Sequence, residues 1–242
     1  MTSFALAHIR VQVESRVPGA LEPSCAASPE MLPSRVEVVD QFIGGIPRRA
    51  LPQMVSAPGV SAGRTALLLA LLAEATARGE FCAMVDAGDS FDPVSAEGAG
   101  VVLQRLLWVR CAGQGLKTME QSFKAVDILA QNGGFGLIAA DLSWLPESLV
   151  RKVPLTTWFR LARVLEKAPT ALLFLMSCAA AQSCAGLTLH LAGEERCFRG
   201  AEKVFHARLL AQLRCQVTID RARGRKPVQA APSSLVAWPR WA

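Results

Sequence analysis

The ten residues SAPGVSAGRT (56–65) lie between a short apolar run and a longer, strongly apolar run of helical length. In α/β proteins a phosphate-binding loop occupies such a place, between a strand and a helix. In the pattern G-x-x-x-x-G-K-[ST], backbone N–H groups surround the phosphates, the lysine reaches the terminal phosphates and the hydroxyl holds magnesium. Gly63, Thr65 and the loop length fit this pattern, whereas Pro58 replaces the first glycine and Arg64 replaces the lysine. The segment is therefore a partial match to a phosphate-binding loop.

From residue 51 onward, short apolar runs of strand length alternate with longer helical segments. This alternation predicts an α/β fold with a mostly parallel, twisted sheet flanked by helices. The expected strands cover residues 53–57, 81–86, 107–111, 135–141 and 170–176. The expected helices cover residues 65–78, 93–106, 117–131 and 155–167. Two further runs, 187–192 and 209–221, have no clear helix between them, so we expect them as added edge strands in an antiparallel arrangement.

The composition is that of one sizeable folded domain with a small appendage. Of the 242 residues, 51% are hydrophobic and 19% are charged, which excludes global disorder. The most apolar window, 65–77, contains Glu74 and is shorter than the roughly 20 apolar residues that span a membrane. The N-terminus has no basic region ahead of an apolar stretch, so we expect a cytoplasmic protein without a membrane segment. The seven cysteines form no C-x-x-C pair and are expected as reduced core thiols.

The positive charge is concentrated near the C-terminus. Residues 194–242 carry ten Lys and Arg against four acidic residues, so this part accounts for the whole formal net charge of +6. Such a basic end suits non-specific DNA or an acidic partner, and a solvated basic surface is the alternative. A candidate basic patch is formed by Arg221, Arg223, Arg225 and Lys226. These residues would present a ridge to phosphates, or they would form a charged edge that prevents aggregation between strands.

Three further segments resemble bacterial recombinases of the RecA family. GGIPRRAL (44–51) resembles the family pattern G-G-L-P-x-G, and FCAMVDAGDSFDP (81–93) resembles F-I-D-A-E-x-x-L-D-P. FGLIAADL (135–142) is an apolar strand ending in the acid Asp141, the form of a Walker B element whose carboxylate orients magnesium. Over about residues 36–176 the resemblance implies a RecA-like P-loop core, for which ATP with magnesium is the candidate ligand and no cofactor is certain. It assigns the degenerate nucleotide-binding loop to Gly59, Ser61, Ala62, Gly63, Arg64 and Thr65.

The departures from that family pattern predict that hydrolysis is crippled. The family carries an acid that activates the attacking water at the position of Gly88, which has no side chain. Asp89 is adjacent, but a one-residue offset in a strand directs a side chain the other way. Met176-Ser177 stands where the family has a polar sensor pair, and 178–186 is short and carries no basic residue, so the DNA-binding loop of recombinases looks lost. We therefore expect no catalytic residue and no resident metal, with Thr65 and Asp141 as the magnesium ligands if nucleotide binds.

A RecA-like fold that has lost ATP hydrolysis resembles the ImuA-like accessory proteins of bacterial mutagenesis cassettes. Looser motifs carry this resemblance, namely RVPGAL (16–21), LPSRV (32–36) and RARG (221–224). It implies a non-catalytic role in the SOS response and error-prone translesion synthesis. The implied partners are an inactive Y-family polymerase homologue, an error-prone replicative-type polymerase or a recombinase. The alternative hypothesis is a weak ATPase that binds single-stranded DNA in repair, with Arg64 contacting phosphate.

The predicted domain organisation has three parts. An N-terminal helix and proline-rich linker cover residues 1–35, the RecA-like core covers 36–226, and a tail covers 227–242. Trp108, Trp144 and Trp158 fall in or beside core elements and are expected to be packing residues. Trp238 and Trp241 in the tail would dock on this domain or on a partner. The three histidines, His8, His190 and His206, lie far apart in sequence and are expected to be ordinary surface or hydrogen-bonded residues.

Overall fold

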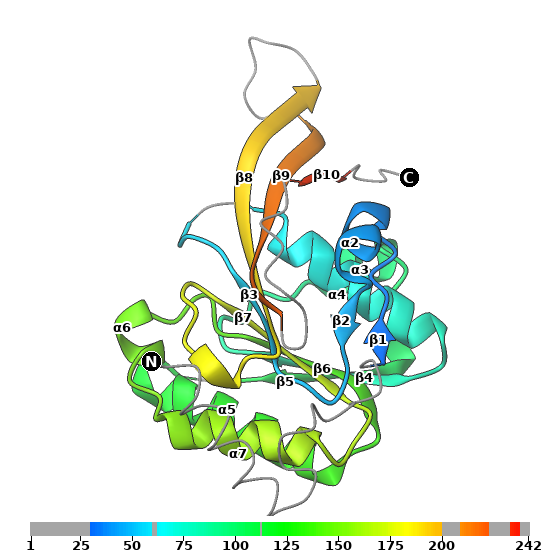
Figure 1. Cartoon of the computed structure of the whole chain (residues 1–242). Coiled ribbons are helices and arrows are strands. Elements are labelled where there is room, and N and C mark those ends of the chain that lie inside the picture. The colour runs from blue at the N-terminus through cyan, green and yellow to red at the C-terminus, as the bar shows by residue number, and fades with distance from the viewer. Residues whose placement is uncertain (1–29, 60–61, 112, 200–208, 223–232, 238–242) are drawn as a thin grey trace, which may run out of the picture.

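The structure is a computed structural model that describes residues 30–59, 62–111, 113–199, 209–222 and 233–237 (Figure 1). Several sequence predictions therefore lie outside the described residues: the N-terminal helix, Ser61, His8, His206, Arg223, Arg225, Lys226, Trp238 and Trp241. In the described part of the chain, none of the helices has the length and apolar character needed to cross a membrane.

The centre of the fold is an eight-stranded sheet with the order β10-β9-β8-β3-β7-β6-β4-β5. Six neighbouring strands, from β8 to β5, run parallel, and β9 and β10 are antiparallel additions at one side. The strands are β3 (Pro52–Val55), β4 (Phe81–Asp86), β5 (Leu106–Arg110), β6 (Phe135–Asp141), β7 (Ala171–Met176), β8 (Leu187–Arg199), β9 (Leu209–Ala222) and β10 (Ser233–Ala237). A separate small ribbon pairs β1 (Met31–Leu32) with β2 (Ile46–Pro47).

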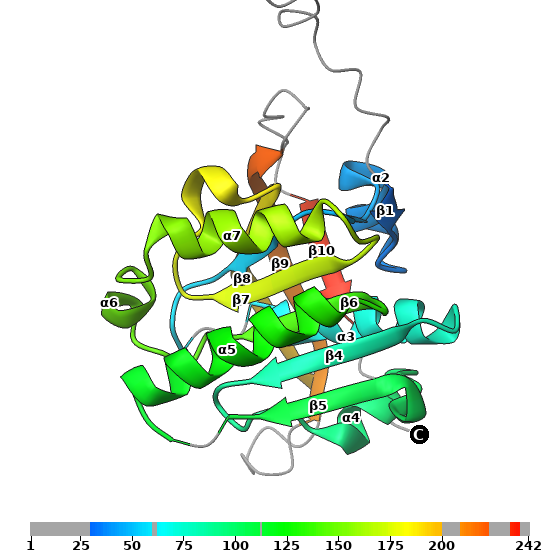
Figure 2. The ribbon, with the colours of Figure 1, turned by 90° about the horizontal axis from the view of Figure 1, so that it is seen from below.

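Helices cover both faces of this sheet, as Figures 1 and 2 show. One face carries α2 (Glu37–Ile43), α3 (Arg64–Ala77) and α4 (Pro93–Gly98), and the other carries α5 (Leu116–Asn132), α6 (Glu147–Val150) and α7 (Leu155–Leu165). Every residue of β7 is buried because the strand is covered on both sides, which explains its unbroken apolar sequence. The α/β fold with a mostly parallel sheet is confirmed.

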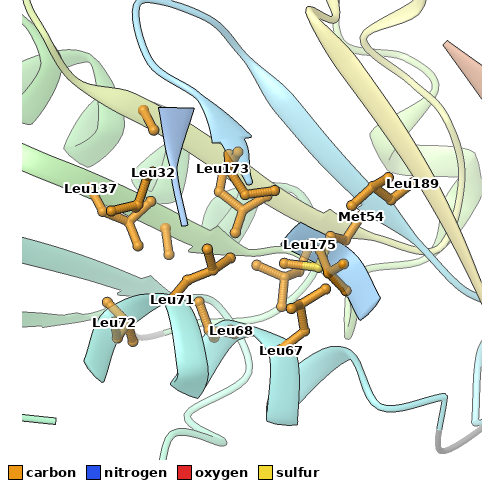
Figure 3. Packing of buried hydrophobic residues seen from close by; sticks show 14 of the residues in the cluster. Leu32, Met54, Leu67, Leu68, Leu71, Leu72, Leu137, Leu173, Leu175 and Leu189 are labelled. Carbon is orange, nitrogen blue, oxygen red and sulfur yellow. The ribbon is translucent and has the colours of Figure 1, made fainter. Parts of the chain in front are cut away.

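The face covered by α3 holds the core shown in Figure 3. Leu67, Leu68, Leu71 and Leu72 recur at helical spacing on α3 and are almost fully buried. They pack with apolar side chains of the sheet and of β1, among them Leu32, Met54, Leu137, Leu173, Leu175 and Leu189. Leu32 belongs to the predicted linker, so the folded core includes part of that segment; the three-part division of the chain otherwise stays a prediction.

One prediction about an individual element is wrong, and another is confirmed with a different neighbour on one side. The helix expected over 93–106 ends after Gly98, because Gly100 adopts a left-handed φ of +95°, and only a short 3₁₀ turn (Leu103–Arg105) follows. The antiparallel arrangement expected for the runs 187–192 and 209–221 is confirmed, because β8 pairs antiparallel with β9. On its other side β8 pairs in parallel with β3, and it runs on to Arg199. Because β7 and β8 both pair in parallel with β3, the chain must cross over from the end of β7 to the start of β8. Residues 177–186 make this crossover with the 3₁₀ turn Gln182–Cys184 and without a regular α-helix. The strand β10 lies in the segment expected as a tail.

Cys82, Cys178, Cys184 and Cys215 are buried, and Cys111 is half-buried. Burial raises the pKa of the Cys82 thiol to about 12, so this side chain remains a protonated, unreactive core residue at neutral pH.

A buried guanidinium, that of Arg48, joins the amino ends of several strands. Its Nη1 donates to the carbonyl oxygens of Gly136 and Pro169, each at 3.1 Å, and its Nη2 donates to Glu80 at 2.7 Å. The Arg48 side chain is only 4% exposed. Glu80 precedes β4, Gly136 lies in β6 and Pro169 precedes β7, so one cation connects three neighbouring strands.

We expect Arg48→Ala to lower the free energy of unfolding by about 3 kcal/mol, because the variant leaves these buried acceptors without their donor. The measurement is urea denaturation of the full chain. Arg49→Ala is the matched control: Arg49 is exposed and donates to one backbone carbonyl, that of Glu166, so its loss should cost less than about 0.5 kcal/mol. Equal costs for the two variants would contradict a structural role for Arg48.

Candidate nucleotide site

The carboxyl ends of the parallel strands bring the predicted site residues to one edge of the sheet. Val55 of β3 is in register with Met176 of β7, and Asp141 of β6 is in register with Asp86 of β4. The loop after β3 leads into α3, whose first residue is Arg64. The structure thus places Arg64, Asp141 and Asp86 around the same end of the sheet, and β7 lies between the strand that enters the loop and the strand that ends in Asp141.

The loop itself has only part of the usual phosphate-binding geometry. Pro58 and Gly59 are exposed, Ala62 is buried, and Gly63 caps α3 with a left-handed φ of +74°. Thr65 is exposed in the first turn of α3. Pro58 supplies no backbone N–H. This loop therefore offers fewer donors to a phosphate than a loop that begins with glycine.

Arg64 makes its contacts with the protein itself. Its Nη1 donates to the Ser56 hydroxyl at 2.5 Å and to the Met176 carbonyl at 3.4 Å. Burial lowers the pKa of Arg64, and the charge of Asp141 acts in the opposite direction. The guanidinium connects the start of α3 to the ends of β3 and β7, where a P-loop lysine would instead extend to the phosphates.

Asp141 is a mostly buried carboxylate, 8% exposed. Its Oδ1 accepts the backbone N–H of Ser143 at 2.9 Å. Burial is the largest influence on its pKa and raises it, while Ser143 and Arg64 act to lower it. Asp141 and Thr65 are the side chains that could hold a nucleotide-bound magnesium ion. In the described part of the chain, no group of three or more His, Cys, Asp or Glu side chains is placed to hold a metal ion by itself.

Asp86 has a role that the sequence analysis missed. This fully buried carboxylate accepts the backbone N–H groups of Gly88 at 3.1 Å, Ser90 at 3.2 Å and Phe91 at 2.9 Å. It also accepts the indole N–H of Trp108 at 3.3 Å. An Asp at a strand end followed by glycine and serine is a recognisable turn signal. Asp86 therefore shapes the loop after β4.

The indole of Trp144 lies against Gly88, the position at which the resemblance to recombinases implies a catalytic acid. A Cβ atom on Gly88 would lie 2.2 Å from Cδ1 and 2.5 Å from Cγ of Trp144, so no larger residue fits without movement of the indole. Trp144 is 68% exposed, which contradicts the prediction that it is a packing residue. It lies in the turn after β6, where one part of the ring covers Gly88 and the rest contacts solvent.

The Asp89 carboxylate, next to Gly88, is bound to Arg110. The two side chains form a bidentate ion pair with distances of 2.6 and 2.5 Å, and the hydrogen bond lowers the pKa of Asp89. The Arg110 guanidinium lies over the ring of Trp108, 5.0 Å from its centroid. This arrangement directs Asp89 toward the end of β5.

The segment that follows Met176-Ser177 is a compact crossover. Cys178, Ala181 and Cys184 are buried, and the Ala181 N–H donates to the side chain of Gln53 at 3.3 Å. At the predicted basic patch, the described residue Arg221 is exposed and donates to the Gln182 carbonyl at 3.4 Å. The described histidine His190 lies 3.6 Å from Asp220.

Comparison with known proteins agrees with this geometry. Residues 32–150 match the RecA N-terminal domain family. Over 99 residues, or 41% of this chain, the protein is 37% identical to Protein RecA of Ectopseudomonas oleovorans and 35% identical to Protein RecA of Thermus thermophilus. The alignments cover 26% and 27% of those proteins, so the chain matches about a quarter of the length of these curated relatives. With the observed sheet, these matches show a RecA-like core.

We predict that Gly88→Ala lowers the free energy of unfolding by about 1 kcal/mol, because its new methyl group overlaps the Trp144 indole. In a Trp144→Ala background the same substitution should cost almost nothing, and a double-mutant cycle by chemical denaturation measures the difference. Gly98→Ala is the control, since no atom lies within 4 Å of its Cβ position. An equal cost of Gly88→Ala in both backgrounds would show that the indole does not fill this space.

We predict that Asp141→Asn stabilises the fold at neutral and alkaline pH. Because burial raises the folded-state pKa of Asp141, wild-type stability falls as the pH rises from the ordinary aspartate range through that raised value. The advantage of the variant should therefore be absent at acidic pH and appear above that range in denaturation series at several pH values. Asp89→Asn should behave oppositely, because the pKa of Asp89 is lowered. A difference in the free energy of unfolding between Asp141→Asn and the wild type that stays constant with pH would contradict this prediction.

Proposed function

We propose that this protein is a non-catalytic accessory protein, built on a RecA-like core, that acts in bacterial DNA damage tolerance through contacts with other proteins. The RecA relatives support a role connected with DNA repair. The observation that carries the non-catalytic part of the proposal is the Trp144 indole over Gly88. An aromatic ring occupies the place from which a carboxylate would activate water.

The other carboxylates at this edge of the sheet have different partners. Hydrolysis of a nucleotide needs a group that orients and activates the attacking water. Asp86 accepts four hydrogen bonds from its own loop and from Trp108, and Asp89 is paired with Arg110. Asp141 is buried beside Arg64. None of these three is presented to a bound phosphate as a free base.

The contacts of Arg64 support a limited role for nucleotide. With its Nη1 bound to Ser56 and Met176, the guanidinium must leave these acceptors before it can reach a phosphate. If ATP binds, Thr65 and Asp141 would hold its magnesium, which neutralises phosphate charge, and the backbone around Gly59 and Gly63 would contact the phosphates. Nucleotide would then act as a structural or switching ligand.

Within damage tolerance, we propose error-prone translesion synthesis in the SOS response, as for ImuA-like proteins. The partners would be a Y-family polymerase homologue, an error-prone replicative-type polymerase or a recombinase. The second candidate function is a weak ATPase that binds single-stranded DNA, which the retained Gly63, Thr65 and Asp141 favour. Arg221, exposed at the end of β9, is the described residue that would contribute to DNA contact.

The test compares damage-induced mutation frequencies in cells with and without the gene. We expect deletion to abolish the induced mutations, and an Arg64→Ala, Asp141→Asn allele to restore them, because neither side chain is needed for a non-catalytic role. Purified wild-type protein should release no phosphate from ATP with magnesium, with or without single-stranded DNA. The purified variant must keep a cooperative unfolding transition.

Two outcomes would count against the proposal. Phosphate release by the wild type, together with failure of the folded variant to restore mutagenesis, would establish the ATPase. An unchanged frequency of induced mutations in the deletion strain would contradict the translesion role. The phosphate-release assay would then decide whether the protein is non-catalytic.

A further inference from the structure

A groove lies between the carboxyl-terminal part of α5 and the outer side of α7, in the helical layer seen in front of the sheet in Figure 2. Its volume is about 1060 Å³. Apolar side chains, including Ala130, Phe159 and Val164, alternate in its lining with the cations Arg160, Arg163 and Lys167. The groove is formed by different residues from the nucleotide site and plays no part in the chemistry described above.

Phe159 is the unusual apolar residue of this groove. The core-facing side of α7 is already complete, because Trp158, Leu161 and Leu165 recur at helical spacing and are fully buried. Phe159 lies off this stripe and is 52% exposed. Large aromatic side chains at a concave surface are typical anchors of protein interfaces. Phe159 therefore offers apolar contact area that the fold itself does not require.

The charge of the groove is positive. Its lining contains Arg160, Arg163 and Lys167 against one acidic residue, Glu166. Arg160 is 3.5 Å from Asp127, whereas no ion pair of the described residues includes Arg163 or Lys167, which are both exposed. Cations near the end of α7 also complement its helix dipole, but that effect gives no reason for an exposed phenylalanine beside them.

We propose that this groove binds an acidic peptide segment of a partner protein, with one large apolar side chain packed against Phe159 and carboxylates beside Arg163 and Lys167. The combination of an apolar lining with exposed, unpaired cations matches an acidic, apolar peptide in both respects. A nucleic-acid backbone would place phosphates against Glu166 and against apolar surface, so it matches less well. The proposal requires neither nucleotide nor a role in translesion synthesis, and it goes beyond the function proposed above.

The test selects peptides from a random displayed library on the purified full chain. Enriched sequences should combine Asp or Glu with an aromatic or large aliphatic residue. A fluorescent synthetic peptide of the leading sequence is then titrated with wild type and variants by anisotropy. Arg163→Glu with Lys167→Glu, and separately Phe159→Ala, should each weaken binding roughly tenfold or more. The loss caused by the charge reversals should shrink as salt rises, and the loss caused by Phe159→Ala should not.

Matched controls use residues of the same kinds at other places. Leu116 is 54% exposed and is the first residue of α5, so Leu116→Ala removes an exposed apolar side chain at the end of this helix away from the groove. Lys117→Glu reverses a charge near the opposite end of α5. Both controls should leave peptide binding unchanged, and all variants alter exposed side chains, so their unfolding midpoints should stay close to that of the wild type.

Three results would overturn the proposal. The first is a library selection without acidic enrichment, and the second is peptide binding that the groove variants do not weaken. The third is displacement of the peptide by a single-stranded oligonucleotide whose own binding is lost in the Arg163→Glu, Lys167→Glu variant. This result would make the groove a nucleic-acid site. None of these results bears on whether ATP is hydrolysed, so the groove and the nucleotide site are tested independently.

Discussion

A buried cation needs acceptors, and the acceptors of Arg48 belong to strands that are distant in sequence. Its guanidinium is bound by Glu80 before β4, by the Gly136 carbonyl in β6 and by the Pro169 carbonyl before β7. A Cβ at Gly136 would lie 1.6 Å from a Glu80 carboxylate oxygen, so a larger residue there would displace the Glu80 side chain that Arg48 binds. Desolvation makes any loss of these contacts costly. The interaction therefore aligns the amino ends of neighbouring parallel strands, and with them the opposite ends where the nucleotide site forms.

At the carboxyl ends of the strands a second arginine, Arg64, also binds groups of the protein itself. Arg64 is half-buried and binds Ser56 and the Met176 carbonyl, so it stabilises the junction of α3 with β3 and β7. Asp86 and Asp89 likewise hold the loop after β4 and the end of β5. The polar residues of this site are thus used mainly to maintain its own loops. These contacts support the non-catalytic role proposed above.

The sequence was sufficient to predict the parallel sheet, and the bounds of 81–86 and 135–141 are confirmed, because these strands are unbroken apolar runs with clear ends. It failed where a local conformation or a distant contact decides the outcome. Gly100 ends a helix that the apolar pattern would have continued. Trp144 covers Gly88 only because β4 and β6 are neighbours in register, and the groove exists only where α5 and α7 meet. Such pairings depend on contacts between separate elements, which the pattern of one element does not contain.

The helix α5 extends from the end of the sheet that carries the candidate nucleotide site to the groove. Its first turn follows the carboxyl end of β5, at the same end of the sheet as the candidate nucleotide site, and its last turn lines the groove. Its 17 residues correspond to a length of about 26 Å. Phe123, near the middle of α5, contacts Trp158 of α7 and Phe174 of β7, with ring centroids 5.2 and 5.9 Å apart. This aromatic cluster fixes α5 against both the neighbouring helix and the sheet. Coupling between the ends would need a second arrangement of this helix, and the close aromatic packing opposes one. A peptide in the groove should therefore bind with the same affinity whether or not nucleotide is present.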